Sequence, residues 1–370
     1  MATYSQINPA SVIRDALIEA PDDYALDMAF PKIFGIPAGP DGPGGTGVVE
    51  SRAIDMSGTP GILAGSIVVC NDRDLLGANA QQSVGRALGS ARTQSTTYTR
   101  ATRSFAGKLF DGFSKELIQH VKDGFTAEEE QHLARIAAMS AKYAMEKYCV
   151  DFFLAKAGEG GRNSDKRGGW TETDWQTGLS GAALGSSNST LEVLHSAINS
   201  LELTGACRPN ALYMGRPVMQ KLQIDPQVLS RVVTGDATKG VSSVIGMPVA
   251  PESHVRSVLA EHLGITEVVV GGAIHQNQAS GDAASSAYLW DSNRMWLGKA
   301  APIAMSLRSG AEPRVLSGTC SFCCVFSALY ETEIDYEKIV GPQYLECVVQ
   351  TIADLVALKP SQGMIIHNLY

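Results

Sequence analysis

The chain has 370 residues, of which 44% are hydrophobic and 18% are charged, and its formal net charge is −8. This composition is typical of a globular protein with about two domains and is too apolar for a disordered chain. The negative charge argues against nucleic-acid binding by overall electrostatics. The polar first residues carry no secretion signal, and no apolar run approaches the roughly 20 residues of a membrane span. We therefore expect a protein made in the cytoplasm.

Residues 35–107 offer little material for a hydrophobic core. A short helical arm is expected over 1–33, followed at 39–47 by a Gly- and Pro-rich hinge without the Gly-Lys-Ser/Thr of a phosphate loop. Residues 35–107 are mostly Gly, Ser, Thr, Ala and Arg, apart from the apolar run at 62–70. Such a stretch cannot offset its ordering entropy by burying its own surface. We expect it to become ordered only on another copy of the chain.

Within this stretch, residues 86–108 contain five basic residues and no acidic one. The alternating residue pattern of Thr96-Thr-Tyr-Thr-Arg-Ala-Thr102 predicts one leg of an extended β-ribbon. The closing residues 331–370 have the opposite charge balance, with six acidic residues against two lysines. We predict that the ribbon lies on an acidic surface of a neighbouring subunit, through the contact residues Arg86, Arg92, Arg100, Arg103 and Lys108. The alternative is that these cations are simply solvated.

Two helices are expected next. Apolar residues recur at helical spacing over 110–122, and a longer helix is expected over 126–157, where Thr126 and Glu129 form a capping box. The longer helix carries a stripe of small and apolar residues for about 30 residues, or some 45 Å. The stripe consists of Leu133, Ala137, Ser140, Ala144, Tyr148, Phe152 and Ala155. Its small residues predict that another element packs closely along it.

Beyond Trp170 the pattern changes to alternating strands and helices. Helices are expected at 189–203, 217–222, 226–233 and 252–263. Strands are expected at 211–214, 266–270, 287–290, 295–297, 303–307, 319–336, 343–358 and 363–367. The four tryptophans, Trp170, Trp175, Trp290 and Trp296, are assigned to the core or to interfaces.

Catalytic and metal-binding signatures do not occur. There is no phosphate loop, dinucleotide fingerprint, HExxH or GxSxG motif, so no enzyme activity, catalytic residue or cofactor is assigned. His275, beside Gln276 and Asn277, is assigned to a surface loop tip. The segment from Cys320 to Cys324 holds one CxxC but lacks the second pair that a structural zinc site requires. We predict that Cys320, Cys323 and Cys324 are reduced, buried in a strand and free of metal.

One segment resembles a known family. The residues Arg208-Pro-Asn-Ala-Leu-Tyr-Met-Gly-Arg-Pro-Val-Met-Gln-Lys-Leu, followed by Ile224-Asp-Pro-Gln-Val-Leu, resemble the major capsid proteins of tailed bacteriophages, which share the Hong Kong phage capsid fold. In that family a short strand ending in Gly leads into a helix and then into a Pro-containing turn. The likeness continues in order through the arm around Phe30-Pro31-Lys-Ile-Phe, the Arg-rich ribbon, the helix at 126–157, Val268-Val-Val-Gly-Gly-Ala and Ala287-Tyr-Leu-Trp-Asp.

The resemblance implies an α+β phage major capsid fold. Its parts would be an N-terminal arm, an extended β-ribbon loop, a peripheral domain with a long spine helix, and an axial α/β domain. The implied boundaries are 1–50 for the arm, 51–110 for the extended loop, 111–205 for the peripheral domain with its spine helix, 206–325 for the axial domain and 326–370 for the return strands of the peripheral domain.

The resemblance also implies a function. The chain would be a structural major capsid protein, not an enzyme, that assembles into hexamers and pentamers of an icosahedral phage head around double-stranded DNA. It would be located in the virion after synthesis in the host bacterial cytoplasm. Its partners would be other copies of itself, a separate scaffolding protein, a portal and a decoration protein. DNA would lie near it without specific contacts, and no membrane would be involved.

Two differences from the type member of the family and two alternative functions complete this interpretation. The type member carries a scaffolding segment ahead of its arm and cross-links Lys to Asn, and neither feature is assigned in this sequence. The first alternative is an encapsulin-like compartment shell. The second is an α/β metabolic enzyme with its catalytic domain at 206–330.

Overall fold

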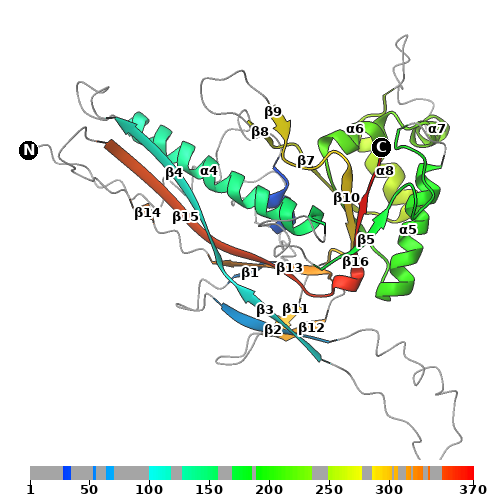
Figure 1. Cartoon of the computed structure of the whole chain (residues 1–370), viewed down its shortest axis with the longest axis horizontal. Helices are drawn as coiled ribbons and strands as arrows, with labels where there is room; N and C mark the ends of the chain where they lie inside the picture. Colours follow the sequence, from blue (N-terminus) through cyan, green and yellow to red (C-terminus); the bar gives the residue numbers. More distant parts are fainter. Residues whose placement is uncertain are drawn as a thin grey trace, which may run out of the picture.

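The computed structural model describes residues 28–34, 53–55, 64–70, 100–117, 127–156, 169–185, 189–235, 249–276, 286–301, 304–306, 314–317, 320–327, 332–333 and 344–370. Figure 1 shows three parts: long strands beside a long helix, a sheet flanked by helices, and a small ribbon below them. The expected hinge at 39–47 and the capping residue Thr126 lie outside the described residues.

The long helix α4 (Ala127–Leu154) confirms the helix expected at 126–157. It packs against β4 (Lys108–Leu117) and β15 (Tyr344–Ala357), which pair antiparallel. The small residue Ala137 is fully buried, and Gly112 of β4 comes so close to it that an added Cβ would lie 1.8 Å from the Ala137 carbonyl oxygen. The prediction that an element packs closely along the small-residue stripe is therefore confirmed, although Ser140 of that stripe is exposed.

The prediction of a helix over 110–122 is wrong. Residues 110–117 belong to β4, and 118–122 lie outside the described residues. Phe110, Gly112 and Ser114 are buried whereas Leu109 is 51% exposed, so the burial that is seen alternates with the period of a strand. The ladder to β15 runs from Lys108↔Ala353 to Leu117↔Tyr344. This long-range pairing outweighs the local helical spacing.

The same sheet is completed by three shorter strands. β13 (Phe322–Ser327) runs antiparallel to β15, and β1 (Ala53–Asp55) runs parallel to β13. β14 (Thr332–Glu333) also pairs with β15. The predicted strands at 319–336 and 343–358 are confirmed over the described residues 322–327, 332–333 and 344–357. The arm contributes α2 (Phe30–Phe34), which lies beside α4.

A second five-stranded sheet forms the part that we call the axial region. Its strand order is β5-β16-β10-β6-β7, with β5 parallel to β16, β6 parallel to β7, and β10 antiparallel to both β16 and β6. The strands are β5 (Thr171–Asp174), β16 (Gly363–His367), β10 (Arg294–Gly298), β6 (Ala211–Gly215) and β7 (Glu267–Gly271). Residues from 171–174 and 363–367 therefore share one sheet with residues 211–298. The domain boundaries remain expectations.

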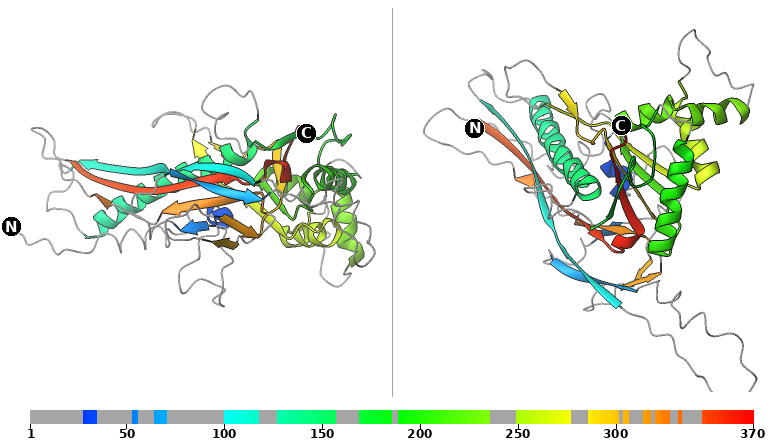
Figure 2. Two further views of the ribbon diagram at one scale, coloured as in Figure 1. Left: turned by 90° about the horizontal axis from the view of Figure 1, so that it is seen from below. Right: turned by 45° about the vertical axis from the view of Figure 1, so that its right-hand side comes forward.

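Four helices pack around the axial sheet, and all were expected from the sequence. They are α5 (Thr190–Gly205), α6 (Arg216–Gln223), α7 (Pro226–Gly235) and α8 (Glu252–Leu263). Their apolar faces and those of the strands form one continuous core, which includes Leu194, Leu212, Val218, Leu259 and Ile366. In Figure 2, the long strands extend away from this region and the helices gather around it.

An aromatic cluster joins the end of α4 to the axial sheet. The ring of Phe153 lies 4.9 Å from that of Trp296 and 5.1 Å from that of Tyr213, measured between centroids. Trp170 and Phe322 complete the cluster. These rings are almost entirely buried, and the four tryptophans of the chain are all 0% exposed. The assignment of the tryptophans to the core is confirmed, and the two sheets share this packing.

The ribbon consists of β2 (Ala64–Cys70) and β3 (Arg100–Ala106), which pair antiparallel along their whole length. β12 (Arg314–Ser317) pairs parallel with β2, and β11 (Ala304–Ser306) pairs with β12. For β2 and β3, the expectation that residues 35–107 become ordered only on another copy is wrong, because these strands pair within one chain. The rest of that stretch, apart from β1 and Gly107, lies outside the described residues.

Candidate assembly surfaces

The five cations predicted to touch a neighbouring subunit fall in different settings. Arg86 and Arg92 lie outside the described residues. Arg100 opens β3 opposite Cys70. Arg103 and Lys108 have contacts inside their own chain: the Arg103 Nε donates to the Leu358 carbonyl oxygen at 3.2 Å, and the Lys108 Nζ lies 4.6 Å from the centre of the Tyr148 ring.

Asp354 of β15 organises the corner where β3 turns into β4. The side chain is 7% exposed. Its Oδ2 accepts the backbone N–H of Ala106 at 3.0 Å, and its Oδ1 accepts the Tyr148 hydroxyl at 2.6 Å. Burial and the neighbouring Asp354 charge raise the pKa of Tyr148 far above its ordinary value, so the phenol stays protonated and donates. We call Ala106, Lys108, Tyr148 and Asp354 the corner cluster.

The corner cluster changes the interpretation of the ribbon. Asp354 is one of the six acidic residues of 331–370, and it contacts the ribbon of its own subunit. Along β3, Arg103 and Phe105 are turned inward whereas Thr102 and Ser104 are exposed. The alternation that predicts the strand could also have placed Arg103 on the same face as the apolar Phe105. The inter-subunit role of the five cations remains a prediction.

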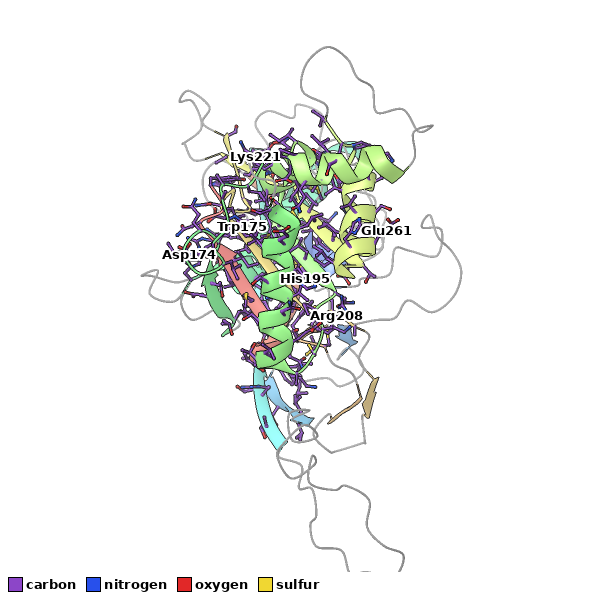
Figure 3. The ribbon with its side chains drawn as sticks, turned by 90° about the vertical axis from the view of Figure 1, so that its right-hand side faces the viewer. Asp174, Trp175, His195, Arg208, Lys221 and Glu261 are labelled. Atoms are coloured by element: carbon purple, nitrogen blue, oxygen red, sulfur yellow. The ribbon has the colours of Figure 1, made fainter. Side chains whose placement is uncertain are left out.

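Exposed apolar side chains mark further candidate contact surfaces. Leu109 on β4 is 51% exposed and Ile136 on α4 is 44% exposed. Both lie in the part formed by α4 and the sheet of β4, β15, β13, β1 and β14, which we call the long body. In the axial region Leu203 is 86% exposed at the end of α5. Figure 3 shows the face formed by α5 and α8, with His195, Arg208 and Glu261 upon it. Single exposed apolar side chains are common on protein surfaces, so they indicate where contact is possible without naming the partner.

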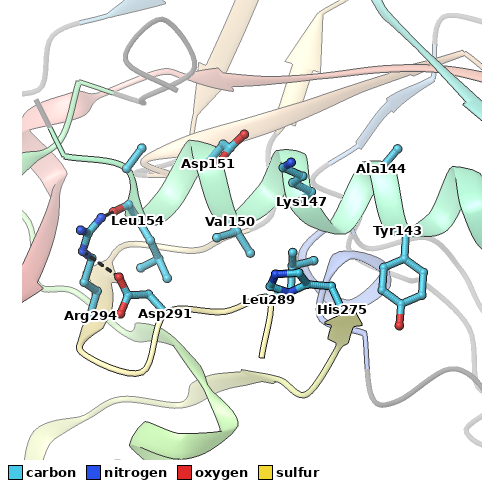
Figure 4. Close-up of a pocket in the computed structure, with 11 residues that line it drawn as sticks. Tyr143, Ala144, Lys147, Val150, Asp151, Leu154, His275, Leu289, Asp291 and Arg294 are labelled. Atoms are coloured by element: carbon cyan, nitrogen blue, oxygen red, sulfur yellow. Dashed lines mark hydrogen bonds and ion pairs between the residues drawn. The ribbon is translucent and has the colours of Figure 1, made fainter. Parts of the chain in front are cut away.

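A cavity of about 450 Å³ lies on the side of α4 that faces β8 (Ile274–Gln276) and the loop after β9 (Ser286–Tyr288). Figure 4 shows the polar side chains that line it: Tyr143, Lys147, Asp151, His275, Asp291 and Arg294. The assignment of His275 to a loop tip is wrong, because it lies in the strand β8 and is half-buried. Its position in a wall next to α4 depends on tertiary packing.

The polar groups of this cavity are largely engaged in structural contacts. The Tyr143 hydroxyl donates to the Ile274 carbonyl oxygen at 2.6 Å, and Asp291 pairs with Arg294 at 2.9 Å. The lining contains no Ser or Cys nucleophile. Within the described part of the chain, no group of three His, Cys, Asp or Glu side chains could hold a metal ion. The described residues thus offer no arrangement that would assign a reaction to the cavity.

The cysteines of the CxxC segment are buried, as predicted. Cys320 is 1% exposed, and Cys323 and Cys324 are 0% exposed. All three are free thiols, and burial raises the pKa of the Cys323 thiol well above its ordinary value. The Cys320 Sγ donates to the Phe322 carbonyl oxygen at 2.9 Å. They behave as small core residues, and the absence of metal at this segment remains a prediction.

Two acidic residues that organise the structure, Glu146 and Asp354, were not singled out from the sequence. Asp354 stands within the apolar run 352–358, which is a signal that sequence reading could have used, since a buried charge requires partners. Among the described helices, none is long and apolar enough to cross a membrane.

Comparison with known proteins gives likenesses of structure only. No family model and no curated protein matches the chain. A virus-like particle from Pyrococcus furiosus matches with a TM-score of 0.49 and 9% identity, over 98% of this chain and 100% of that chain. A phage-related protein from Bordetella bronchiseptica matches with a TM-score of 0.48 and 12% identity, over 83% and 88%. The capsid of the cyanophage P-SCSP1u matches with a TM-score of 0.45 and 10% identity, over 87% and 88%.

Each of these TM-scores lies below 0.5 and each identity below 25%. The function is therefore inferred from the chain's own motifs and geometry.

Proposed function

We propose that this chain is a major capsid protein, a structural subunit that assembles into hexamers and pentamers of an icosahedral phage head. The observation that carries the proposal is the segment that resembles the capsid family. It folds as β6, then α6 with Gly215 as its N-cap, then α7, in the predicted order. The strand β6 is buried along its length and lies between β10 and β7 in the axial sheet. The motif thus lies inside the axial region, with its strand paired on both sides.

The order of the other elements supports the same function. An arm segment at α2, a ribbon of β2 and β3, the long helix α4 and the axial sheet follow one another as the resemblance implies. The ribbon contributes few side chains to a core of its own, so additional burial would come from contact with other copies. Many weak contacts of this kind give a stable shell, because each one is made at high effective concentration once its neighbours are in place.

The finer parts of the proposal follow from the resemblance. The partners would be a separate scaffolding protein, a portal and a decoration protein, and the shell would enclose double-stranded DNA. The subunit would be made in the bacterial cytoplasm and end in the virion. The net charge of −8 suits a wall that holds DNA without binding it tightly.

The test is the oligomeric state of the expressed full-length chain. The chain should form shells, hexamers or pentamers in sedimentation velocity and negative-stain microscopy as its concentration is raised. Nuclease-resistant DNA inside particles made in infected cells would separate a phage head from a protein-filled compartment. A chain that sediments as a single 39.2 kDa species over the whole concentration series, with and without a crowding agent, would contradict the proposal.

A further inference from the structure

Glu146 is a fully buried carboxylate in the middle of α4. Its side chain is 0% exposed. Three N–H groups point at it: the backbone N–H of Ala29 at 2.9 Å from Oε1, the backbone N–H of Phe30 at 2.8 Å from Oε2, and the indole Nε1–H of Trp290, which donates to Oε1. A buried carboxylate is stable only with such donors around it.

Two of these donors belong to the main chain of the arm. Ala29 and Phe30 are consecutive residues at the beginning of α2, where the first N–H groups of a helix have no partner inside the helix. The carboxylate therefore contacts the backbone of the arm and not its side chains. Apolar contacts also hold the arm on α4. Met28, Phe30 and Ile33 are each at most 7% exposed and pack in the core around α4.

The third donor, the indole N–H of Trp290, connects the arm site to a distant part of the chain. Trp290 lies between β9 and β10 and is 0% exposed. Its indole packs so tightly on Gly271 of β7 that an added Cβ there would lie 2.1 Å from the Nε1. One carboxylate oxygen, Oε1, thus accepts hydrogen bonds from both the arm and the edge of the axial region.

The electrostatics of Glu146 agree with this geometry. The pKa of the Glu146 carboxyl is raised, because the effect of burial outweighs the hydrogen bonds from Ala29, Trp290 and Phe30 and the positive charge of Lys32, which act in the opposite direction. The nearby Glu146 charge also contributes to a raised pKa at Tyr143. Two of the three hydrogen bonds and the Lys32 charge come from the arm, so docking of the arm favours the ionised form of the carboxyl.

We propose that Glu146 is the docking site of the arm segment 28–34 on α4, and that Trp290 supports the same carboxylate from the axial region. The site binds a main-chain segment through two consecutive N–H groups and buried apolar side chains. α4 keeps its packing against β4 and β15 on another face, so the arm can be released without unfolding the helix. The inference concerns the single subunit and stands independently of the proposed function.

The test is hydrogen–deuterium exchange of the full-length chain carrying Glu146→Gln. The amide of glutamine replaces one acceptor oxygen by an N–H₂ donor, which faces the N–H groups of the arm without accepting them. Exchange at the amides of Ala29 and Phe30 should become at least about tenfold faster, which corresponds to about 1.4 kcal/mol of lost local protection. Exchange within α5 should not change.

A matched control is Glu261→Gln on the exposed face of α8, which makes the same chemical change away from the arm. It should leave exchange at 28–34 as in the unmodified chain. Equal acceleration in both variants, or unchanged exchange at Ala29 and Phe30 in a folded Glu146→Gln chain, would overturn the proposal.

A second variant keeps the test decisive if Glu146→Gln does not fold. Trp290→Phe removes the indole N–H and changes no residue of the arm or of α4. It should accelerate exchange at Ala29 and Phe30 by a few-fold, because the shared Oε1 then loses one of its two donors. Exchange at these two amides that equals that of the unmodified chain would contradict the coupling through Glu146.

Discussion

The axial region and the ribbon of β2 and β3 are both built on paired strands, yet they are stabilised differently. The axial region encloses its own core between a five-stranded sheet and four helices. The ribbon contributes Ile67, Val69 and Phe105 to a small cluster whose other members, Cys323, Val356 and Leu358, belong to the long body. The axial region is therefore self-sufficient, whereas the ribbon depends on contacts with the rest of the chain.

The largest effect is expected from Leu212→Ala in the axial core. Leu212 lies in β6 and is 0% exposed. The substitution removes buried methyl groups and leaves a cavity, so it should lower the free energy of unfolding by about 2–5 kcal/mol. Chemical denaturation followed by far-UV circular dichroism measures this loss. A change below about 1 kcal/mol would show that the axial core is not the main source of stability.

Phe105→Ala tests the ribbon. Phe105 is 4% exposed, and its ring fills the space above Gly65, where an added Cβ would lie 2.7 Å from the ring. We expect a local destabilisation of about 3 kcal/mol, at the lower end for a buried Phe because the cluster is small. Amide exchange in 64–70 and 100–106 should accelerate while exchange in α5 and α8 stays constant. Equal acceleration in all four elements would remove the distinction between the two regions.

Asp354→Asn tests the connection between the ribbon and the long body. The amide can still accept one of the two hydrogen bonds from Ala106 and Tyr148, but it lacks the negative charge that strengthens both. The loss should be about 1–2 kcal/mol, seen as faster exchange at Ala106. Asp291→Asn, at an ion pair outside the corner cluster, is the control and should leave Ala106 unchanged. Unaltered exchange at Ala106 in Asp354→Asn would show that the corner does not hold the ribbon.

The smallest effect per residue is expected from the ribbon cations. Replacing Arg92, Arg100 and Arg103 together by Ser should raise the protein concentration needed for assembly, and the difference should shrink as salt is added. Each exposed ion pair contributes only about 0–1 kcal/mol, so the effect depends on several acting together. The matched control replaces the same three residues by Lys, which keeps the charge. Normal assembly of the Ser variant across the salt series would contradict the predicted neighbour contact.

The sequence predicted the self-sufficient part of the molecule best. The bounds of α8 and β16 agree with the expected 252–263 and 363–367. The apolar residues of each element already follow the pattern of its own secondary structure in the sequence. β4 was missed because its strand conformation depends on pairing with β15, more than two hundred residues away. The inward position of Arg103, the burial of Glu146 and the place of His275 beside α4 also arise from contacts between distant segments. The axial motif was identified by its resemblance to a known family, whereas the corner cluster and the arm site depend on contacts between distant segments.

The position of β16 also sets the order in which the molecule can be completed. It lies between β5 and β10 in the axial sheet, so residues 363–367 join strands that begin at 171 and 294. During synthesis, β5 and β10 cannot pair with β16 until residues 363–367 have left the ribosome. The long chain segments between these strands also slow folding, because pairing distant strands costs loop-closure entropy. The axial region therefore acquires its final surface only after almost the whole sequence printed here has been synthesised. A chain that completes its axial region this late cannot present the finished surface of that region while it is still being made.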